Sequence, residues 1–177
     1  VKVSGPNINL SQEEFTYRND QIIFGLAGIK GLRHDMVEEL LSQRKVSGSF
    51  KDFRDLLSRL DSRFRKPELI DALIYSGALD IFNYNRSEML AAAPEYISSI
   101  ELSGGSMELF KALEPKIPHK TEMPLLEKLN KENEYLGAYL SGHPTERYQQ
   151  LLKRLQAKRT NQLADGMKNI YVILYIN

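Results

Sequence analysis

The sequence predicts a mainly α-helical protein with one small β-hairpin near its N-terminus. Apolar residues recur at helical spacing in several stretches, which include residues 36–44, 50–60, 69–75 and 125–140. Two short β-rich runs flank the pair Asn19-Asp20, which is typical of a two-residue hairpin turn. Glycine and proline punctuate the chain between these stretches.

The composition sets limits on the class of protein. The chain has 177 residues, of which 42% are hydrophobic, enough for an ordinary core. It has no cysteine, which excludes disulfides and fits a reducing compartment. No apolar run reaches the length of a membrane span, so we expect a soluble, cytoplasmic chain without a membrane partner. The chain lacks an initiator methionine, and we expect it to be a piece of a longer protein.

Three glycines separate the hairpin from the first helix, and they are Gly25, Gly28 and Gly31. Glycine allows positive φ and the first amides of a helix lack internal partners, so such a turn suits a phosphate oxygen. Lys30 and Arg33 could add cations, whereas His34 is more typical of a solvent-facing helix start. The spacing GxxGxxG is not the dinucleotide fingerprint, and most such turns are structural, so the residues alone leave both readings open.

A second cationic loop follows the helix of residues 50–60, whose apolar face indicates core. The loop carries Arg63, Arg65 and Lys66. Pro67 suits the first position of the next helix. That helix ends at a second glycine turn made of Ser76, Gly77 and Ala78. These cations and amides could form a second phosphate clamp, and the alternative is a solvated loop with an ordinary C-terminal glycine.

The middle of the chain gives weaker signals. Residues 85–93 favour a helix capped by Asn85 or Ser87, and Pro94 predicts a kink or break before a second short helix at 96–100. Beyond it, residues 103–106 and three prolines predict the least regular region.

The last part alternates helices with breakers. Residues 125–140 predict a long helix that ends at 141–144, with Gly142 as a left-handed cap. His143 fits a structural turn better than a metal site, because no cysteine or second histidine is near. Residues 146–158 predict a basic helix that either adds to a nucleic-acid contact or keeps the chain soluble, and residues 170–176 predict a strand.

Four segments resemble a known family. FGLAGIKGLRHDMVEELLSQR at 24–44, GSFKDF at 48–53 and LIDALIYSGALD at 69–80 resemble the tandem helix-hairpin-helix region of bacterial replicative DNA polymerase III alpha subunits, which are C-family polymerases. EYLGAYLSGHP at 134–144 resembles the segment before the oligonucleotide-binding (OB) domain of those subunits. Separated matches in the right order are stronger than any one alone.

The resemblance implies that the chain binds the backbone of duplex DNA and does not recognise base sequence. It places Gly28, Ile29, Lys30, Gly31 and Arg33 in the first hairpin and Ser76, Gly77 and Ala78 in the second. With Arg63, Arg65 and Lys66 of the basic loop, these are the predicted DNA-binding residues. One departure is that Arg33 stands where the motif usually has a second glycine.

The resemblance also implies a sliding clamp as partner. In the family a short peptide in this region ends in Leu-Phe or Met-Phe and inserts two apolar anchors into the clamp. The matching residues are Ser106, Met107, Glu108, Leu109 and Phe110, with Ser106 in place of the usual glutamine. The alternative is a local helix that packs Leu109, Phe110 and Leu113 on the core.

We therefore expect five parts, which are a lead-in and hairpin at 1–24, a tandem helix-hairpin-helix region at 25–100, a flexible segment at 101–124, a helical connector at 125–160 and the first strand of a truncated OB-fold at 161–177. No catalytic residue, metal or cofactor is expected in the chain, since the resemblance places the magnesium-binding aspartates of the parent polymerase upstream. The expected partners are duplex DNA, the sliding clamp and the other polymerase domains. A structural adaptor without DNA contact remains an alternative, as does a nuclease or lyase that would need Lys30 or an acidic cluster as catalyst.

Overall fold

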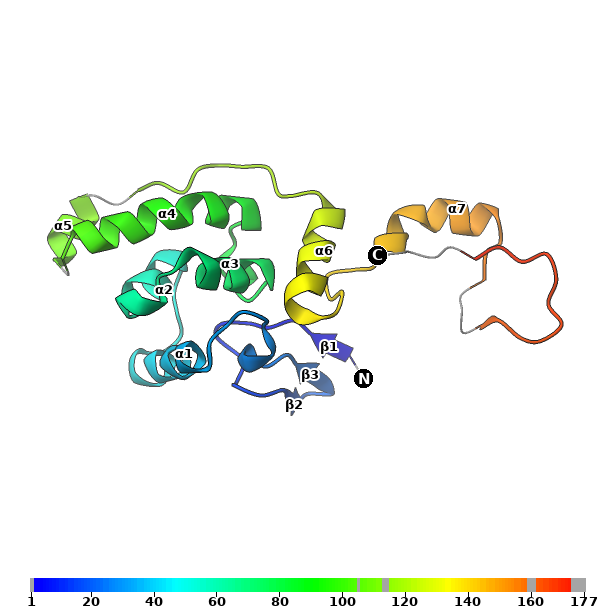
Figure 1. Ribbon diagram of the computed structural model, residues 1–177, viewed down its shortest axis with the longest axis horizontal. Helices are drawn as coiled ribbons and strands as arrows, with labels where there is room; N and C mark the ends of the chain where they lie inside the picture. The colour runs from blue at the N-terminus through cyan, green and yellow to red at the C-terminus, as the bar shows by residue number, and fades with distance from the viewer. Residues whose placement is uncertain (1, 105, 113–114, 159–161, 173–177) are drawn as a thin grey trace. The chain divides into compact units, whose positions relative to one another are not determined.

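The computed structural model describes residues 2–104, 106–112, 115–158 and 162–172 (Figure 1). The chain divides into two compact units, Val1–Leu140 and Ser141–Asn177. The division falls inside the predicted connector, and the two units are described separately below.

A three-stranded sheet opens the first unit. Its strands are β1 (Lys2–Ser4), β2 (Thr16–Arg18) and β3 (Gln21–Ile23), in the order β1-β3-β2. The predicted hairpin is confirmed, because β2 and β3 pair antiparallel and both turn residues, Asn19 and Asp20, have positive φ. β1 pairs parallel to β3, whereas an irregular lead-in was expected.

Helices make up most of the rest of this unit, which confirms the mainly α class. They are α1 (His34–Ser47), α2 (Phe53–Arg59), α3 (Pro67–Tyr75), α4 (Arg86–Leu102), α5 (Met107–Ala112) and α6 (Leu125–Leu136), with 3-10 turns η1 (Leu26–Gly28), η2 (Ser62–Phe64) and η3 (Asp80–Phe82). α4 packs against α2 and α3, and α3 also packs against α6 (Figure 1). Pro67 is at the first position of α3, as predicted.

One apolar core joins these helices to the segment before the sheet hairpin. Its fully buried members include Ile8, Leu26, Met36, Phe53, Phe64, Leu73 and Met89. Burial of a large apolar side chain stabilises a fold by about 1.5–3 kcal/mol, so tertiary packing rather than helix propensity fixes the shorter helices.

Two predicted helix boundaries are wrong. α4 runs through Pro94 as one helix, so the predicted break and the separate helix at 96–100 are wrong, whereas the alternative of a kink stays a prediction. The core contacts of Met89 and Tyr96 on either side outweigh the backbone hydrogen bond that proline removes. α6 ends at Gly137, whose φ of +69° makes the left-handed cap, five residues before the predicted cap at Gly142.

The second unit contains η4 (Pro144–Tyr148) and α7 (Gln149–Arg154), so the helix predicted at 146–158 is shorter than expected. The amide of Lys158 donates to the carbonyl of Tyr171, 2.9 Å away. Of the predicted strand, residues 170–172 form no strand, and 173–176 lie outside the described residues. No helix in the described part of the chain has the length and apolar character needed to span a membrane.

Candidate nucleic-acid interface

The first hairpin joins η1 to α1 through residues 29–33. Ile29 is buried in the core, and its amide donates to Leu26 O over 3.1 Å. The amide of Lys30 donates to Tyr135 O of α6, 2.8 Å away, while the side chain of Lys30 is exposed. Gly31 has a φ of +86° and open space where a Cβ would stand. The backbone of the turn is therefore fixed to α6 through Lys30, while the side of the turn at Gly31 faces open space.

α1 begins at this turn without a side-chain cap. Its N-cap residue is Arg33, whose side chain accepts nothing from the helix. The first amides of a helix carry the positive end of the helix dipole. In α1 the amide of Met36 already donates to Asp35 Oδ1 over 3.1 Å, so the amides of His34 and Asp35 are the ones that an anion can use. An uncapped helix start next to an exposed glycine turn is suited to bind an anion.

The basic side chains at this helix start already lie against carboxylates. Arg33 donates two hydrogen bonds to Asp35, over 3.0 and 2.8 Å, and the side chain of Arg33 is exposed while that of Asp35 is partly exposed. His34 lies 3.1 Å from Glu13 and 3.6 Å from Glu38. Exposed ion pairs are weak, so a phosphate can compete with Asp35 for the guanidinium of Arg33.

The loop at 61–67 carries a second exposed guanidinium, that of Arg63. The hydrogen bond from Arg33 lowers the pKa of Asp35, and the charge of Arg63 adds to this effect. Arg63 is exposed, stacks 4.6 Å above the ring of Phe64 and lies 3.7 Å from Asp61. The charges of Arg33 and Arg63, predicted from separate loops, therefore both favour the ionised form of Asp35.

The other two cations of this loop differ from Arg63. Lys66 is exposed and is the N-cap residue of α3, where its side chain makes no cap hydrogen bond. Arg65 is partly buried, and in the described part of the chain its Nε has no hydrogen-bond partner. Lys66 can therefore contact a solvent-borne anion directly, whereas the Nε of Arg65 cannot.

The second hairpin is closed. Ser76 and Ala78 are buried. The three amides of the turn donate to carbonyls of α3, with Ser76, Gly77 and Ala78 bound to Ala72, Ile74 and Leu73 over 3.1, 3.0 and 3.1 Å. Those donors stabilise the helix end, so the turn offers a phosphate no free amide of its own.

Arg86 explains the glycine at position 77. A Cβ there would overlap the guanidinium of Arg86, and φ of Gly77 is +80°. Arg86 is 2% exposed and donates to Asp80, over 3.0 and 2.8 Å, to the carbonyl of Tyr75 and to Glu132. Burial alone would lower the pKa of Arg86, but Asp80 and Glu132 outweigh burial and raise it, so the guanidinium stays charged.

This buried network was missed by sequence reasoning. Arg86 and Glu132 are 46 residues apart, and neither position carries a local motif. The carboxylate of Glu132, also 2% exposed, accepts from Arg86 over 2.9 Å and from the amide of Leu140 over 3.2 Å. α6 therefore contacts the second hairpin through Glu132 and the first through the carbonyl of Tyr135.

The predicted clamp peptide is a short helix. Its residues 107–110 lie in α5, and Ser106 Oγ accepts from the amide of Leu109 over 3.3 Å. Glu108 is exposed, and the side chain of Leu109 is 43% exposed. The side chains of Met107 and Phe110 lie outside the described residues.

Two further expectations concern metals and histidine. Among the residues that the structure describes, no three His, Asp or Glu side chains gather in a group that could hold a metal ion. His143 caps η4 by accepting from the amide of Thr145 over 3.3 Å, which is the structural turn role expected of it.

The open first turn and the closed second turn, each joined to a following helix, define a helix-hairpin-helix protein. The family described as "Helix-hairpin-helix motif" matches residues 1–89. Proteins named DNA polymerase III subunit alpha match most of the chain. The protein of Deinococcus radiodurans is 35% identical over 169 residues, that of Xylella fastidiosa strain Temecula1 33% over 168, and that of Bacillus subtilis 31% over 182.

These alignments cover 85, 88 and 94% of this chain respectively. They confirm the resemblance, and the chain belongs to the family of DNA polymerase III alpha subunits. It spans only 12, 14 and 16% of the lengths of the same three relatives. The chain thus corresponds to a helix-hairpin-helix region of a much longer kind of protein.

Proposed function

We propose that this chain is a non-catalytic part of a replicative DNA polymerase and binds the backbone of duplex DNA through its first hairpin. The observation that carries the proposal is the start of α1, where the N-cap residue Arg33 makes no side-chain cap and its guanidinium is exposed. Arg63 is also exposed, and its charge acts on Asp35, the partner of Arg33. Membership of a family of replication polymerases and the match to the helix-hairpin-helix motif support the same assignment.

The contact would form when a phosphate of the DNA replaces the carboxylate of Asp35 as the partner of Arg33. A phosphate oxygen accepts from the first amides of α1, and Arg33 turns from Asp35 to the phosphate. Arg63 and Lys30 neutralise the neighbouring phosphates. Donors of this kind touch only the sugar-phosphate backbone, so binding is independent of base sequence. The second hairpin supports this surface through α6 and supplies no donor.

The test is the salt dependence of duplex binding by the double variant Arg33→Gln, Arg63→Gln. Each phosphate contact contributes about 0.9 to the slope of log affinity against log salt concentration, so the slope should fall by about 2. The matched control is Lys45→Gln, Lys51→Gln, which removes two exposed cations away from the hairpin. An equal loss in the control, or no loss in either variant, would leave the structural adaptor as the better reading.

One observation favours the adaptor as second candidate. Residues 1–140 carry 18 Lys and Arg against 21 Asp and Glu, so the unit as a whole repels polyanions. An adaptor would contact other polymerase domains through this acidic surface and would show no affinity for duplex DNA in 50 mM salt.

We also propose that residues 106–110 attach the chain to a sliding clamp. Exposure of Leu109 on the short helix α5 supports this, and a fit as an extended peptide would require α5 to unwind. Replacing Leu109 and Phe110 by alanine should abolish clamp binding. Leu102→Ala is the control, because this apolar side chain is nearby in the sequence and 72% exposed. Unchanged affinity in the first variant would remove the clamp from the list of partners.

A further inference from the structure

The two units of the chain differ in charge. The unit Val1–Leu140 carries 18 basic and 21 acidic residues, whereas Ser141–Asn177 carries 6 basic and 2 acidic residues. The first unit is thus −3 and the second +4, which together give the net charge of +1 of the chain. The positive charge that a nucleic acid would attract is concentrated in the 37 residues of the second unit.

The units also differ in how their cations are placed. In the first unit many cations lie against carboxylates, as in Arg33–Asp35, Arg59–Asp55, Arg86–Glu132, Lys128–Glu122 and Lys131–Glu134. In the second unit Lys153, Arg154, Lys158 and Lys168 are exposed. Within residues 141–158 and 162–172 none of these four forms an ion pair. They are available to an external anion without the exchange that Arg33 requires.

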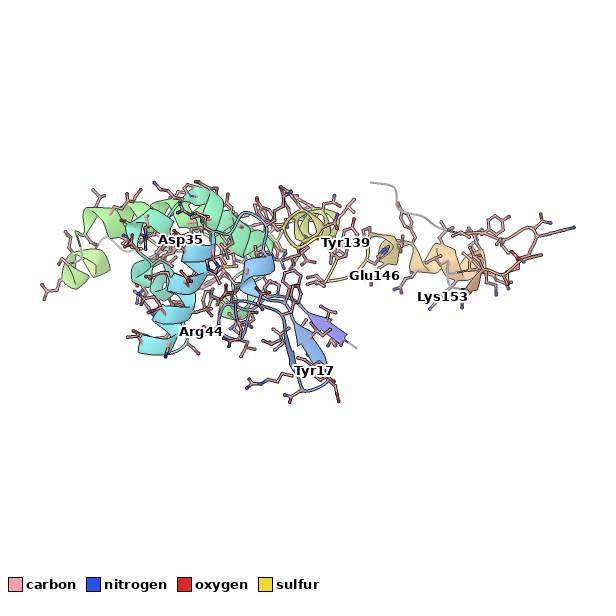
Figure 2. All side chains as sticks on the ribbon, turned by 60° about the horizontal axis from the view of Figure 1, so that its bottom comes forward. Tyr17, Asp35, Arg44, Tyr139, Glu146 and Lys153 are labelled. Carbon is pink, nitrogen blue, oxygen red and sulfur yellow. The ribbon has the colours of Figure 1, made fainter. Side chains whose placement is uncertain are left out.

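The backbone holds three of these cations close together. Lys153 and Arg154 end α7, where the side chain of Lys153 projects from the helix (Figure 2). Leu155 closes the helix by donating to Leu151 O, and Lys158 follows three residues later, after the turn at Gln156. The hydrogen bond from Lys158 N to Tyr171 O then ties this basic end to the far side of the following loop. The result is a compact group of charges on a short, tethered segment.

We propose that Lys153, Arg154 and Lys158, which we call the basic group, form a second contact with the phosphate backbone of nucleic acid, separate from the hairpins. A group of exposed cations suits a polyanion with regularly spaced charges. Point charges on flexible lysine and arginine stems contact phosphates in a duplex or in a single strand, so the chemistry is shared by both.

The test uses the whole chain with the triple variant Lys153→Gln, Arg154→Gln, Lys158→Gln. Its affinity for labelled duplex and for labelled single strand is measured against salt concentration. The expected loss is at least tenfold at 50 mM salt, with the slope falling by about 2–3 for duplex or about 2 for single strand. The strand type with the larger change identifies the form of nucleic acid that the basic group contacts.

The matched control is the triple variant Lys45→Gln, Lys51→Gln, Lys116→Gln, which removes the same charge from exposed positions of the first unit. Its affinity should stay within twofold of wild type. An equal loss in both triple variants would mean that only net charge matters and would overturn the proposal, as would no loss in the first.

A competition experiment separates nucleic acid from an acidic protein surface. Poly-glutamate of matched charge should compete at least tenfold more weakly than the oligonucleotide. Equal competition would assign the basic group to acidic proteins and overturn the proposal. The hairpin variant Arg33→Gln, Arg63→Gln tests the proposed function separately from the basic group. If the two contacts are independent, the losses of binding free energy in the two variants add. If only the basic-group variant loses affinity, the proposed hairpin contact fails and the basic group stands.

Discussion

The two hairpins share a glycine turn but use it in opposite ways. At the first turn Gly31 faces open space, and α1 starts uncapped at Arg33. At the second, Gly77 makes room for the buried guanidinium of Arg86. The helix after it, α4, starts with a complete capping box in which Asn85 and Glu88 bond each other's backbone amides. The two turns therefore differ in the donors that the fold leaves available, since the amides of the second turn are all bonded to carbonyls of α3.

The largest expected effect is on the closed hairpin. Arg86→Ala leaves the buried carboxylate of Glu132 without its cation, and breaking a buried pair in this way costs about 3–5 kcal/mol. The free energy of unfolding in urea measures it. Arg33→Ala, which removes an exposed pair, should stay near wild type. Equal stabilities of the two variants would mean that the second hairpin is not locked by Arg86.

The next effect compares the two glycines. Gly31→Ala should cost about 1–2 kcal/mol, because alanine is strained at positive φ but meets no neighbour. Gly77→Ala should cost about 1–3 kcal/mol more, because its Cβ also displaces the guanidinium of Arg86. Urea unfolding of both variants gives the difference. If Gly31→Ala proved the more harmful, the open description of the first turn would be wrong.

A smaller effect separates binding from stability at the first hairpin. Arg33 has the extended φ and ψ of an N-cap residue, so Arg33→Ser supplies a side-chain acceptor for α1. The new cap contributes about 1 kcal/mol at most, which offsets the lost ion pair, and stability should change little. Duplex affinity should fall, since the serine oxygen occupies the amides and a cation is gone. A variant that binds as well as wild type would place the DNA contact elsewhere.

The smallest effect concerns pH. The pKa of Asp35 is lowered, first by its hydrogen bond from Arg33, so the unfolded chain binds the proton more readily than the folded one. The stabilisation is therefore present above the ordinary pKa of Asp35 and is lost as the pH falls through the lowered value. The stability difference between wild type and Asp35→Asn should be constant above about pH 5 and should shrink in acid. A difference that grows in acid would contradict the lowered pKa.

The sequence predicted correctly those turns and helix ends that are determined by residues a few positions away. The hairpin around Asn19 and Asp20 and the start of α3 at Pro67 were found, because turn and cap residues act within a few positions. β1 was missed, since its pairing partner β3 lies about 19 residues away and three residues carry too little pattern. α6 was extended too far because the apolar spacing continues past Gly137 to Leu140.

The candidate site, too, was predicted only in the part that depends on neighbouring residues. The sequence placed Lys30, Gly31 and Arg33 at the start of a helix, and the structure has them there. It could not indicate that Asp35 holds Arg33, or that Arg63 acts on the same carboxylate, because both depend on side-chain directions. It also could not distinguish Gly77 from Gly31, since the cause is an arginine nine residues later whose other partner is on α6.

The carboxylate of Glu132 has a mechanical consequence. One of its oxygens binds Arg86 and the other accepts from the amide of Leu140, the last residue of the first unit. Tension on the chain from residue 141 onward therefore does not act on a free helix end. The force acts instead on the buried ion pair between Glu132 and Arg86 of α4. The core of the first unit therefore resists the force before α6 can separate from it.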